Sequence, residues 1–495
     1  MNTSLHSDEL NSEHSLASSC ACQISRLALI LKHATFVAIS CGVVNVSSAQ
    51  TVTLRVLMPH EGPVIPAARP ALHNGVFSAY GVQLSPSRDG IYMGELSVVP
   101  PPNGVPVTFI ASNNTVMPNN PTRLFGRFGQ PTVWNGVSYF SGGASHVIND
   151  GVYAGRPDGS PLTVAADRLA GEPWIDFSVA GRAGLAYIHA GINVGTGAGM
   201  SLFTYDHFRI PIVDYNQAMP GGGQMQSTNI NTGDGWISQG GETVAYSVLC
   251  NSPNGSNSGV YAWDTASGNT SLIANWNTPI PGDGRLMLHA TGVDTDGQRV
   301  SFVGANGNPY FGGVHAICVA NIETGALISI ARTGQPVVGV PGATWKRFLH
   351  TAIDGALVYF QASYFSGSSE VFGMFAHDST TATTFAVMIP GQVIGGHAIL
   401  AAWFVPEGID GPDSVAQCEF ITPDSPMLSK KMLVYARIDR PCRADFNSDG
   451  SLDFFDYLDF VGEFAIGSVA ADFNNDGVTD FFDYLDFVQL FSEGC

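Results

Sequence analysis

The sequence predicts a mainly β protein: a β-propeller of about seven four-stranded blades, followed by a small α-helical domain at the C-terminus. Three observations support this prediction. Between residues 51 and 440, a pattern of short apolar strands recurs at blade-sized intervals. Charged residues make up only 13% of the chain while glycine occurs 57 times, a combination typical of β proteins with many tight turns. Near the C-terminus, the octapeptide DFFDYLDF occurs at 453–460 and again at 480–487.

The N-terminal segment has the pattern of an export signal. Arg26 and Lys32 lie before and around an apolar stretch at 34–44, and Ser47-Ser48-Ala49 supplies small residues for a cleavage site. We expect residues 1–49 to be a signal peptide that is removed after Ala49, so that the protein is secreted. An uncleaved anchor is the alternative. No other stretch approaches the roughly 18 apolar residues of a membrane span, so none is expected after cleavage.

The segment 50–440 contains a repeating strand-and-turn unit. One copy reads GGETVAYSVLC, SGVYAWD, TSLIANW and PIPG between 240 and 282, and the next reads DGQRVSFVGANG, GGVHAICV, LISIARTG and VPG between 296 and 342. Asn-Gly or Asp-Gly pairs precede several strands, as hairpin turns require. The first core residues of the opening strands lie 42 to 61 residues apart: Val76, Val137, Leu185, Val244, Val300, Leu357 and Ile399.

A period of this size with several short strands per unit is typical of a β-propeller. One blade cannot bury both of its faces, so neighbouring blades must stack. We expect TVTLRVLM at 51–58 to pair with the last blade and close the ring, which removes open sheet edges. The repeat also resembles that of a family of secreted bacterial proteins with propeller-like modules. That resemblance covers about 74–395 and implies a fold, without a biochemical function.

The propeller segment contains no recognisable catalytic motif. It has neither GxSxG nor HExxH, and we interpret Asp294 and Asp296 in GVDTDGQ as turn-capping residues rather than a catalytic pair. We therefore lean towards a non-catalytic protein, with the question of enzyme activity left open. A carbohydrate or peptide ligand on one propeller face is a further alternative. Three histidines are expected to be hydrogen-bonded strand residues: His289, His315 and His350.

The negative charge of the chain is concentrated near its C-terminus. The formal net charge is −20, and residues 442–495 contribute −11 of it through ten Asp, two Glu and the single cation Arg443. A nucleic-acid partner is excluded because no basic stripe exists. Such a local excess of carboxylates indicates bound cations.

Each octapeptide completes a 12-residue loop, DFNSDGSLDFFD at 445–456 and DFNNDGVTDFFD at 472–483. Both fit D-x-N-x-D-G-x-x-D-x-x-D, which places oxygen ligands at positions 1, 3, 5, 9 and 12, a carbonyl at 7 and glycine at 6. This is the spacing of an EF-hand calcium loop, so we predict two Ca²⁺ ions. The predicted ligands of the first ion are Asp445, Asn447, Asp449, the Ser451 carbonyl, Asp453 and Asp456. Those of the second are Asp472, Asn474, Asp476, the Val478 carbonyl, Asp480 and Asp483.

A loop followed by a helix, twice, with Asp rather than Glu at position 12, resembles a type I dockerin domain over 442–495. The PC at its start and the EGC at its end are similar to a variant found in secreted proteins of planctomycete-like bacteria. The resemblance implies calcium-dependent docking to a cohesin-like or other receptor at the cell surface or in an extracellular complex. It implies that loop positions 10 and 11 contact the partner: Phe454, Phe455, Phe481 and Phe482. Dockerins usually have small polar residues there, so two alternatives are packing of these phenylalanines in the core of the tail and packing on the propeller itself.

Five cysteines remain once the signal is removed. Cys442 and Cys495 bracket the acidic tail, and we expect a disulfide bond between them in an oxidising compartment. At least one of Cys250, Cys318 and Cys418 must be free or pair with another molecule. The sequence thus predicts a secreted, non-catalytic propeller attached to a surface or complex by a calcium-dependent tail. The alternative is a polysaccharide-active hydrolase or lyase docked by the same tail.

Overall fold

A computed structural model describes most of the chain after the predicted signal peptide, and residues 1–49 lie outside the described ranges. Those ranges are 50–59, 64–67, 70–84, 87–96, 105–144, 151–167, 187–188, 200–203, 209–227, 237–252, 255–307, 312–422, 425–439, 443–447, 452–474 and 477–493.

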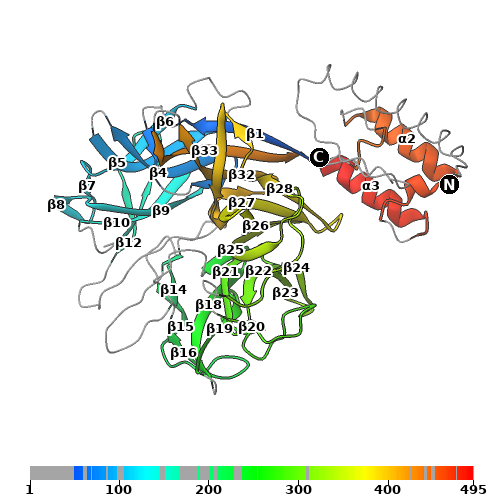
Figure 1. Ribbon diagram of the computed structural model, residues 1–495, viewed down its shortest axis with the longest axis horizontal. Helices are drawn as coiled ribbons and strands as arrows, with labels where there is room; N and C mark the ends of the chain where they lie inside the picture. Colours follow the sequence, from blue (N-terminus) through cyan, green and yellow to red (C-terminus); the bar gives the residue numbers. More distant parts are fainter. Residues whose placement is uncertain are drawn as a thin grey trace, which may run out of the picture. The chain divides into compact units, whose positions relative to one another are not determined.

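The described chain is mainly β, and its strands form antiparallel sheets that follow one another in chain order (Figure 1). The first sheet contains β2 (Val64–Pro66), β3 (Ala71–His73), β4 (Val76–Leu84), β5 (Ser87–Glu95) and β6 (Val107–Ser112). A hairpin of β7 (Val116–Met117) and β8 (Asn120–Leu124) follows it. The next sheet contains β9 (Arg127–Trp134), β10 (Val137–Gly143), β11 (Gly151–Gly155) and β12 (Thr163–Asp167).

The middle of the chain continues this pattern. Three short strands pair as β13 (Tyr187–Ile188), β14 (Met200–Phe203) and β15 (Arg209–Val213). Another sheet contains β16 (Gln224–Ser227), β17 (Ile237–Gly240), β18 (Thr243–Ser252), β19 (Gly255–Asp264) and β20 (Thr270–Ala274). It is followed by β21 (His289–Thr295), β22 (Arg299–Ala305), β23 (His315–Asn321) and β24 (Leu327–Arg332), and then by β25 (Trp345–Asp354), β26 (Leu357–Ser366), β27 (Ser369–Asp378) and β28 (Thr383–Met388).

The last strands of the propeller pair with the first. They are β29 (Val393–Ile394), β30 (His397–Trp403), the 3-10 turn η2 (Pro406–Gly408), β31 (Ile409–Asp410), β32 (Asp413–Thr422) and β33 (Ser425–Asp439). One parallel pair, Phe372 with Ala401, joins β27 to β30. The strand β1 (Thr51–Met58) runs antiparallel along β33, as predicted from the sequence. Consecutive antiparallel sheets, several of them with four or five strands, and an N-terminal strand that pairs with the last one are typical of a β-propeller.

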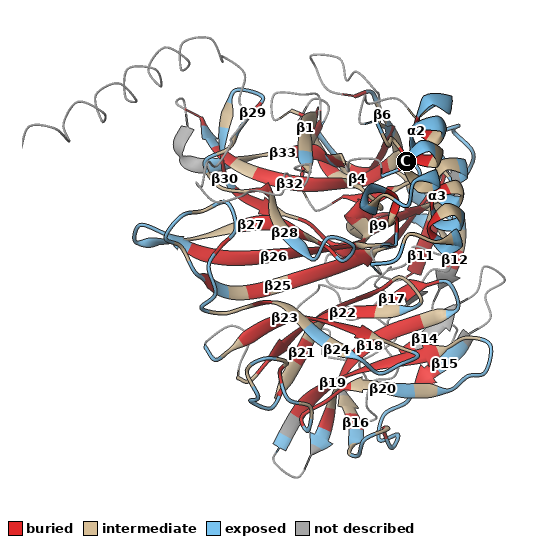
Figure 2. Ribbon diagram, turned by 90° about the vertical axis from the view of Figure 1, so that its right-hand side faces the viewer, coloured by how far each residue is buried: buried red, intermediate tan, exposed pale blue. Residues whose placement is uncertain are grey.

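The second strands of the sheets are buried on both faces, because neighbouring sheets pack against them. Figure 2 shows most of β22 and β26 as buried, and the first eight residues of β26 have buried side chains. One core cluster combines Val303 and Ile317 of one sheet with Trp345, Phe360 and Phe375 of the next. Burial on both faces explains why these strands read as continuous apolar runs rather than as alternating patterns.

The Pro-Gly dipeptides of the repeat form tight turns between sheets. Gly221, Gly282, Gly342 and Gly391 each follow a proline and have φ between +72° and +92°. Proline followed by a residue with positive φ is the pattern of a type II turn, which only glycine adopts readily. Ile280, next to one of these turns, is fully buried. The repeated motif therefore reverses the chain and anchors the connection in the core.

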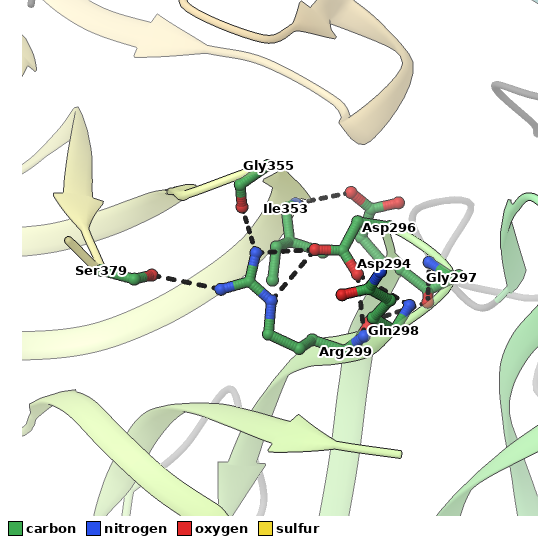
Figure 3. Close-up of polar contacts among 9 residues, drawn as sticks. Asp294, Asp296, Gly297, Gln298, Arg299, Ile353, Gly355 and Ser379 are labelled. Carbon is green, nitrogen blue, oxygen red and sulfur yellow. Dashed lines mark hydrogen bonds and ion pairs between the residues drawn. The ribbon is translucent and has the colours of Figure 1, made fainter. Parts of the chain in front are cut away.

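A buried carboxylate ties three successive sheets together. Asp294 of β21 has no exposed surface, and its Oδ2 accepts the backbone N–H of Ile353 of β25 at 2.7 Å. Its Oδ1 accepts the hydroxyl of Ser238 of β17. Nearby, the Arg299 guanidinium donates to the carbonyl oxygen of Gly355 (Figure 3). Asp294 is thus an inter-sheet link, a role that the GVDTDGQ motif did not predict.

Its neighbour Asp296 does cap the turn, as predicted. Its Oδ1 accepts the backbone N–H groups of Gln298 at 3.0 Å and Arg299 at 2.8 Å. Its Oδ2 forms an ion pair with Arg299 at 2.7 Å (Figure 3). A carboxylate that is engaged at both oxygens by its own turn is a structural group here.

Two further aspartates link the later sheets in the same way. Asp354 of β25 accepts the backbone N–H of Gly411 at 2.8 Å, across the β31–β32 turn of the next sheet. Asp410 of β31 accepts the backbone N–H of Asn74 at 2.6 Å, in the β3–β4 turn of the first sheet. The inter-sheet bonds therefore continue from the last sheet to the first.

Two helices follow the strands: α2 (Phe454–Ala465) and α3 (Phe481–Glu493), with the 3-10 turn η3 (Val469–Ala471) between them. The sequence predicts a helix at about 454–464, and the structure confirms it. Across the described ranges, no helix combines the length and the apolar character that crossing a membrane requires.

Candidate calcium loops and an exposed aromatic surface

Nine of the twelve predicted calcium ligands lie in the described part of the chain. They are Asp445, Asn447, Asp453, Asp456, Asp472, Asn474, Val478, Asp480 and Asp483. Asp449, Ser451 and Asp476 lie outside the described residues. The described part of each loop therefore contains positions 1, 3, 9 and 12 but not position 5.

The first loop folds back onto the carboxylate at its position 12. Asp456 has no exposed surface, and it accepts the backbone N–H of Asn447 at 3.2 Å and that of Asp453 at 2.8 Å. Asp453, at position 9, caps helix α2 by accepting the N–H of Phe455 at 2.8 Å. The two aspartates form a reciprocal capping box, so the frame D-x-x-D both ends the loop and starts the helix.

The second loop repeats this arrangement. Asp483 is fully buried and accepts the backbone N–H of Asn474 at 3.0 Å and that of Asp480 at 2.7 Å. Asp480 in turn accepts the N–H of Phe482 at 2.8 Å. Each of these partners stands 27 residues after its counterpart in the first loop. The two loops are therefore equivalent in hydrogen bonding as well as in sequence.

Glycine at position 6 allows the sharp turn that the motif predicts. Gly477 has φ of +89°, a region that side chains with a Cβ rarely adopt. Its backbone N–H donates to Oδ2 of Asp472, at position 1, at 2.9 Å. The chain thus reverses around the first carboxylate of the loop.

The two position-12 carboxylates are held in their ionised form. Burial raises the pKa of Asp456, but hydrogen bonds from the backbone of Asp453, Asn447 and Phe446 outweigh it and lower the pKa below its usual value. For Asp483, burial likewise raises the pKa and hydrogen bonds from backbone N–H groups lower it, and the net shift is downward. A buried anion stabilised by N–H dipoles is ready to face a cation.

The donor set fits calcium. Every predicted ligand offers oxygen, the donor that Ca²⁺ prefers in shells of six to eight. Among the described residues, no group of three or more His, Cys, Asp or Glu side chains is placed to hold a metal ion. A bound calcium ion would neutralise part of the loop charge and hold positions 1 to 12 together.

Equivalent residues of the two helices meet at the centre of their interface. The rings of Phe460 and Phe487 stack with 3.9 Å between centroids and 2° between planes. The hydroxyl groups of Tyr457 and Tyr484 are 3.2 Å apart. Both pairs join residues 27 positions apart, so the helices are related by a local two-fold axis.

The remaining ring contacts show that the two helices are antiparallel. Phe464, late in α2, lies 5.9 Å from Tyr484, early in α3. Conversely, Tyr457, early in α2, lies 6.3 Å from Phe491, late in α3. The N-terminal turns of α2 and α3 therefore lie at opposite ends of the pair.

These N-terminal turns carry the paired phenylalanines, and their side chains face solvent. We call Phe454, Phe455 and Leu458 the first aromatic surface, and Phe481, Phe482 and Leu485 the second. The phenylalanines of the first are 63% and 64% exposed, and those of the second are 61% and 64% exposed. The leucines are 46% and 45% exposed. The alternative that these phenylalanines form the core is wrong, because the core positions belong to Phe460, Phe473 and Phe487.

Sequence reasoning missed the role of Arg443, the single cation of the tail. Its guanidinium lies over the ring of Phe473, 4.4 Å from the centroid, and donates to the carbonyl oxygen of the same residue. The sequence did contain a signal for this role, because Arg443 is a lone basic residue in an acidic, phenylalanine-rich segment. Arg443 therefore contributes to the packing of the helical pair.

The propeller histidines His289, His315 and His350 lie in strands, as expected. His315 in β23 is 2% exposed, and its Nδ1 has no partner among the described residues. Burial, together with the nearby charges of Arg347 and Lys346, lowers the pKa of His315. Burial is the largest of these causes, and it outweighs a backbone hydrogen bond with Gly312 that raises the pKa. His289 in β21 also has a pKa lowered by burial, and His350 in β25 is buried.

The three propeller cysteines are buried, and none is in a disulfide bond. Burial raises the pKa of all three thiols, to about 12 for Cys318. Cys250 and Cys318 pack as small apolar side chains, and Cys418 contacts the Met388 sulfur at 3.6 Å. Cys442 and Cys495 lie outside the described residues.

No protein-family model matches the chain, and no curated protein matches it. Solved structures are similar to it at low identity. An oligogalacturonate lyase from Vibrio parahaemolyticus is 9% identical, with a TM-score of 0.42 over 79% of this chain and 97% of that one. The β-propeller domain of the Trilobed protease from Pyrococcus furiosus is 10% identical, with a TM-score of 0.39 over 74% and 93%. A virginiamycin B lyase from Staphylococcus aureus is 12% identical, with a TM-score of 0.37 over 79% and 100%.

Proposed function

We propose that this chain is a secreted, non-catalytic propeller protein that a calcium-dependent, dockerin-like tail attaches to a receptor. In this proposal, cleavage after Ala49 releases a closed propeller of about seven blades over 50–440. Residues 442–495 bind two calcium ions and dock to a cohesin-like or other protein at the cell surface or in an extracellular complex. A disulfide bond between Cys442 and Cys495 would close the tail.

One observation carries the calcium part of the proposal. Two loops 27 residues apart make the same hydrogen bonds around a fully buried aspartate at position 12. In each loop, backbone N–H groups surround the buried carboxylate and stabilise its charged form, so both loops are built around an anion in the same way. A cation at the centre of each loop gives that burial a purpose.

The exposed phenylalanines support the docking part. Positions 10 and 11 of both loops present aromatic rings to solvent rather than to the core. Exposed aromatic clusters of this kind mark protein interaction sites. Because the capping box joins each pair to its loop, the metal and the docking residues belong to one local structure.

The carboxylates at the sheet junctions support a non-catalytic propeller. Asp294, Asp354 and Asp410 each accept a backbone N–H from a neighbouring sheet, which assigns them a structural role. Purified chain should therefore release no product from a panel of polysaccharides. New reducing or unsaturated ends would replace this part of the proposal with the hydrolase or lyase alternative.

Calorimetric titration of the chain from Gln50 to Cys495 with CaCl₂ tests the metal sites. We expect two ions per chain, and we expect a chelator to expose the tail to protease while the β signal in circular dichroism persists. Asp445→Ala combined with Asp472→Ala should abolish high-affinity binding. The matched control is Asp459→Ala combined with Asp486→Ala, two exposed aspartates outside the loops. A loop variant that still titrates two ions would show that the ligands are wrong.

A further inference from the structure

We infer that each aromatic surface of the tail docks into an apolar pocket that is rimmed by lysine or arginine on another protein. This inference rests on the proposed docking function and adds the chemistry of the partner. It follows from two independent properties of the surfaces, their apolar centre and their acidic surroundings.

The apolar centre is the same on both helices. Each surface presents two adjacent phenylalanines and a leucine four residues after the first, so the three side chains share one face of the first helical turns. All six side chains are between 45% and 64% exposed. They make no contribution to the core of the helical pair, which is built from other residues. A pocket that covers the rings would remove this apolar area from water.

The surroundings of each centre are acidic. Exposed Asp459 lies beside the first aromatic surface, and exposed Asp486 lies beside the second at the same spacing. The single cation of 442–495, Arg443, is engaged by Phe473. The tail has a formal charge of −11, and two calcium ions would still leave about −7. A partner must therefore supply positive charge around its apolar pocket.

The same charge argues against two other occupants. A second copy of the tail would place acidic rims against each other, and like charges at an interface are unfavourable. An anionic membrane surface repels the tail for the same reason. A basic-rimmed protein pocket is the occupant that satisfies both the apolar and the electrostatic requirement.

Two synthetic amphipathic helical peptides test the inference. They share one leucine face, and their polar faces carry only lysine or only glutamate. The chain from Gln50 to Cys495, with calcium present, is titrated with each by fluorescence anisotropy. We expect the lysine peptide to bind about tenfold or more tightly than the glutamate peptide, and to weaken as NaCl is raised.

The decisive variant replaces Phe454, Phe455, Phe481 and Phe482 by serine, with Phe365→Ser as the control. Phe365 is a propeller phenylalanine that is 49% exposed. The fourfold variant should lose about tenfold or more in affinity for the lysine peptide, and the control should lose none. Unchanged binding by the fourfold variant would mean that charge alone attracts the peptide. Equal binding of the glutamate peptide would remove the role of the acidic rim. Either result overturns the inference.

Two further measurements separate this inference from its competitors and from the proposed function. If the chain self-associates in sedimentation and the fourfold variant does not, the occupant is a second copy. If the chain binds phosphatidylcholine vesicles and the fourfold variant does not, the occupant is a membrane. Either result overturns the inference. Calcium titration of the same variant should still give two ions. If the fourfold variant binds two calcium ions and still binds the lysine peptide as before, only this inference is wrong. If the unsubstituted chain binds no calcium, only the calcium proposal is wrong.

Discussion

The backbone N–H of Asn74 donates a 2.6 Å hydrogen bond to Oδ2 of Asp410, a residue 336 positions later in the chain. Asn74 lies in the turn after β3, and Asp410 ends β31, so the bond joins equivalent turns of the first and last sheets. The imidazole of His73 lies on the same carboxylate, with Nδ1 3.9 Å from Oδ1, and stacks on Trp134 of the next sheet at 4.0 Å. These contacts hold the two ends of the propeller together.

Replacement of Asp410 should weaken this junction. Asp410→Ala removes the acceptor of the exposed Asn74 N–H, and the net loss of such a hydrogen bond is typically about 0.5–1.5 kcal/mol of unfolding free energy. Asp410→Asn keeps an acceptor oxygen and should recover most of that loss. Urea denaturation followed by circular dichroism measures both, with the exposed Glu323→Ala as control. Equal stability of Asp410→Ala and the control would show that the hydrogen bond contributes nothing.

The stacked pair Phe460 and Phe487 should be essential for the helical pair. Both rings are fully buried, and truncation of a buried phenylalanine to alanine usually costs about 3–5 kcal/mol. A core this small has little stability to lose, so Phe460→Ala should unfold α2 and α3. Phe454→Ala, at a 63% exposed site in the same helix, should change stability by less than about 0.5 kcal/mol. Limited proteolysis distinguishes the two, and similar cleavage rates would contradict the assigned core.

Thiol accessibility should divide the cysteines into two classes. Cys250, Cys318 and Cys418 are buried with raised pKa values, so none should react with iodoacetamide at neutral pH in the native protein. Unfolding without reduction should expose these three thiols. Reduction should add Cys442 and Cys495 if they form the proposed disulfide bond. Mass spectrometry that finds five alkylated sites before reduction would exclude the bond.

Stability should fall as the solution becomes mildly acidic. Burial lowers the pKa of His315 in the folded state below its unfolded value of 6.5. The neutral ring therefore stabilises the fold fully above about pH 6.5, and this contribution is lost as the pH falls towards the folded pKa, because the unfolded chain then binds more protons. His315→Gln should reduce the slope of stability against pH in that range. An unchanged slope would show that His315 does not titrate differently on unfolding. His289 and His377 shift in the same direction and should retain part of the slope.

The elements that local patterns determine were predictable. The apolar runs predict the strands, and the Pro-Gly dipeptides predict the turns. The D-x-x-D pattern predicts where α2 begins, because helix capping depends on residues only three positions apart. Pairing of 51–58 with the last sheet was also predictable, since a propeller needs a strand to cover its final edge.

Contacts between sheets were not predictable in the same way. Asp294 and Asp296 belong to one short motif, yet Asp296 caps its own turn while Asp294 binds groups on neighbouring sheets. The partner of Asp294 on β25 is 59 residues away, and a single sequence contains no record of that proximity. Similarly, DFFDYLDF has too many apolar residues for one helical stripe. The choice of Phe460 for the core and of Phe454 for solvent depends on the packing of α2 against α3.

The pairing of β1 with β33 also determines the order in which the propeller can be completed. Residues 51–58 leave the ribosome before every other strand that the structure describes, yet their partner strand ends at Asp439, where the Thr53 hydroxyl donates to the aspartate carboxylate at 2.7 Å. Strand β1 therefore cannot form this pairing until residues 425–439 have emerged. A chain that stops short of 425–439 would leave that strand without a partner, and a chain without 51–58 would leave the edge of β33 open to other strands.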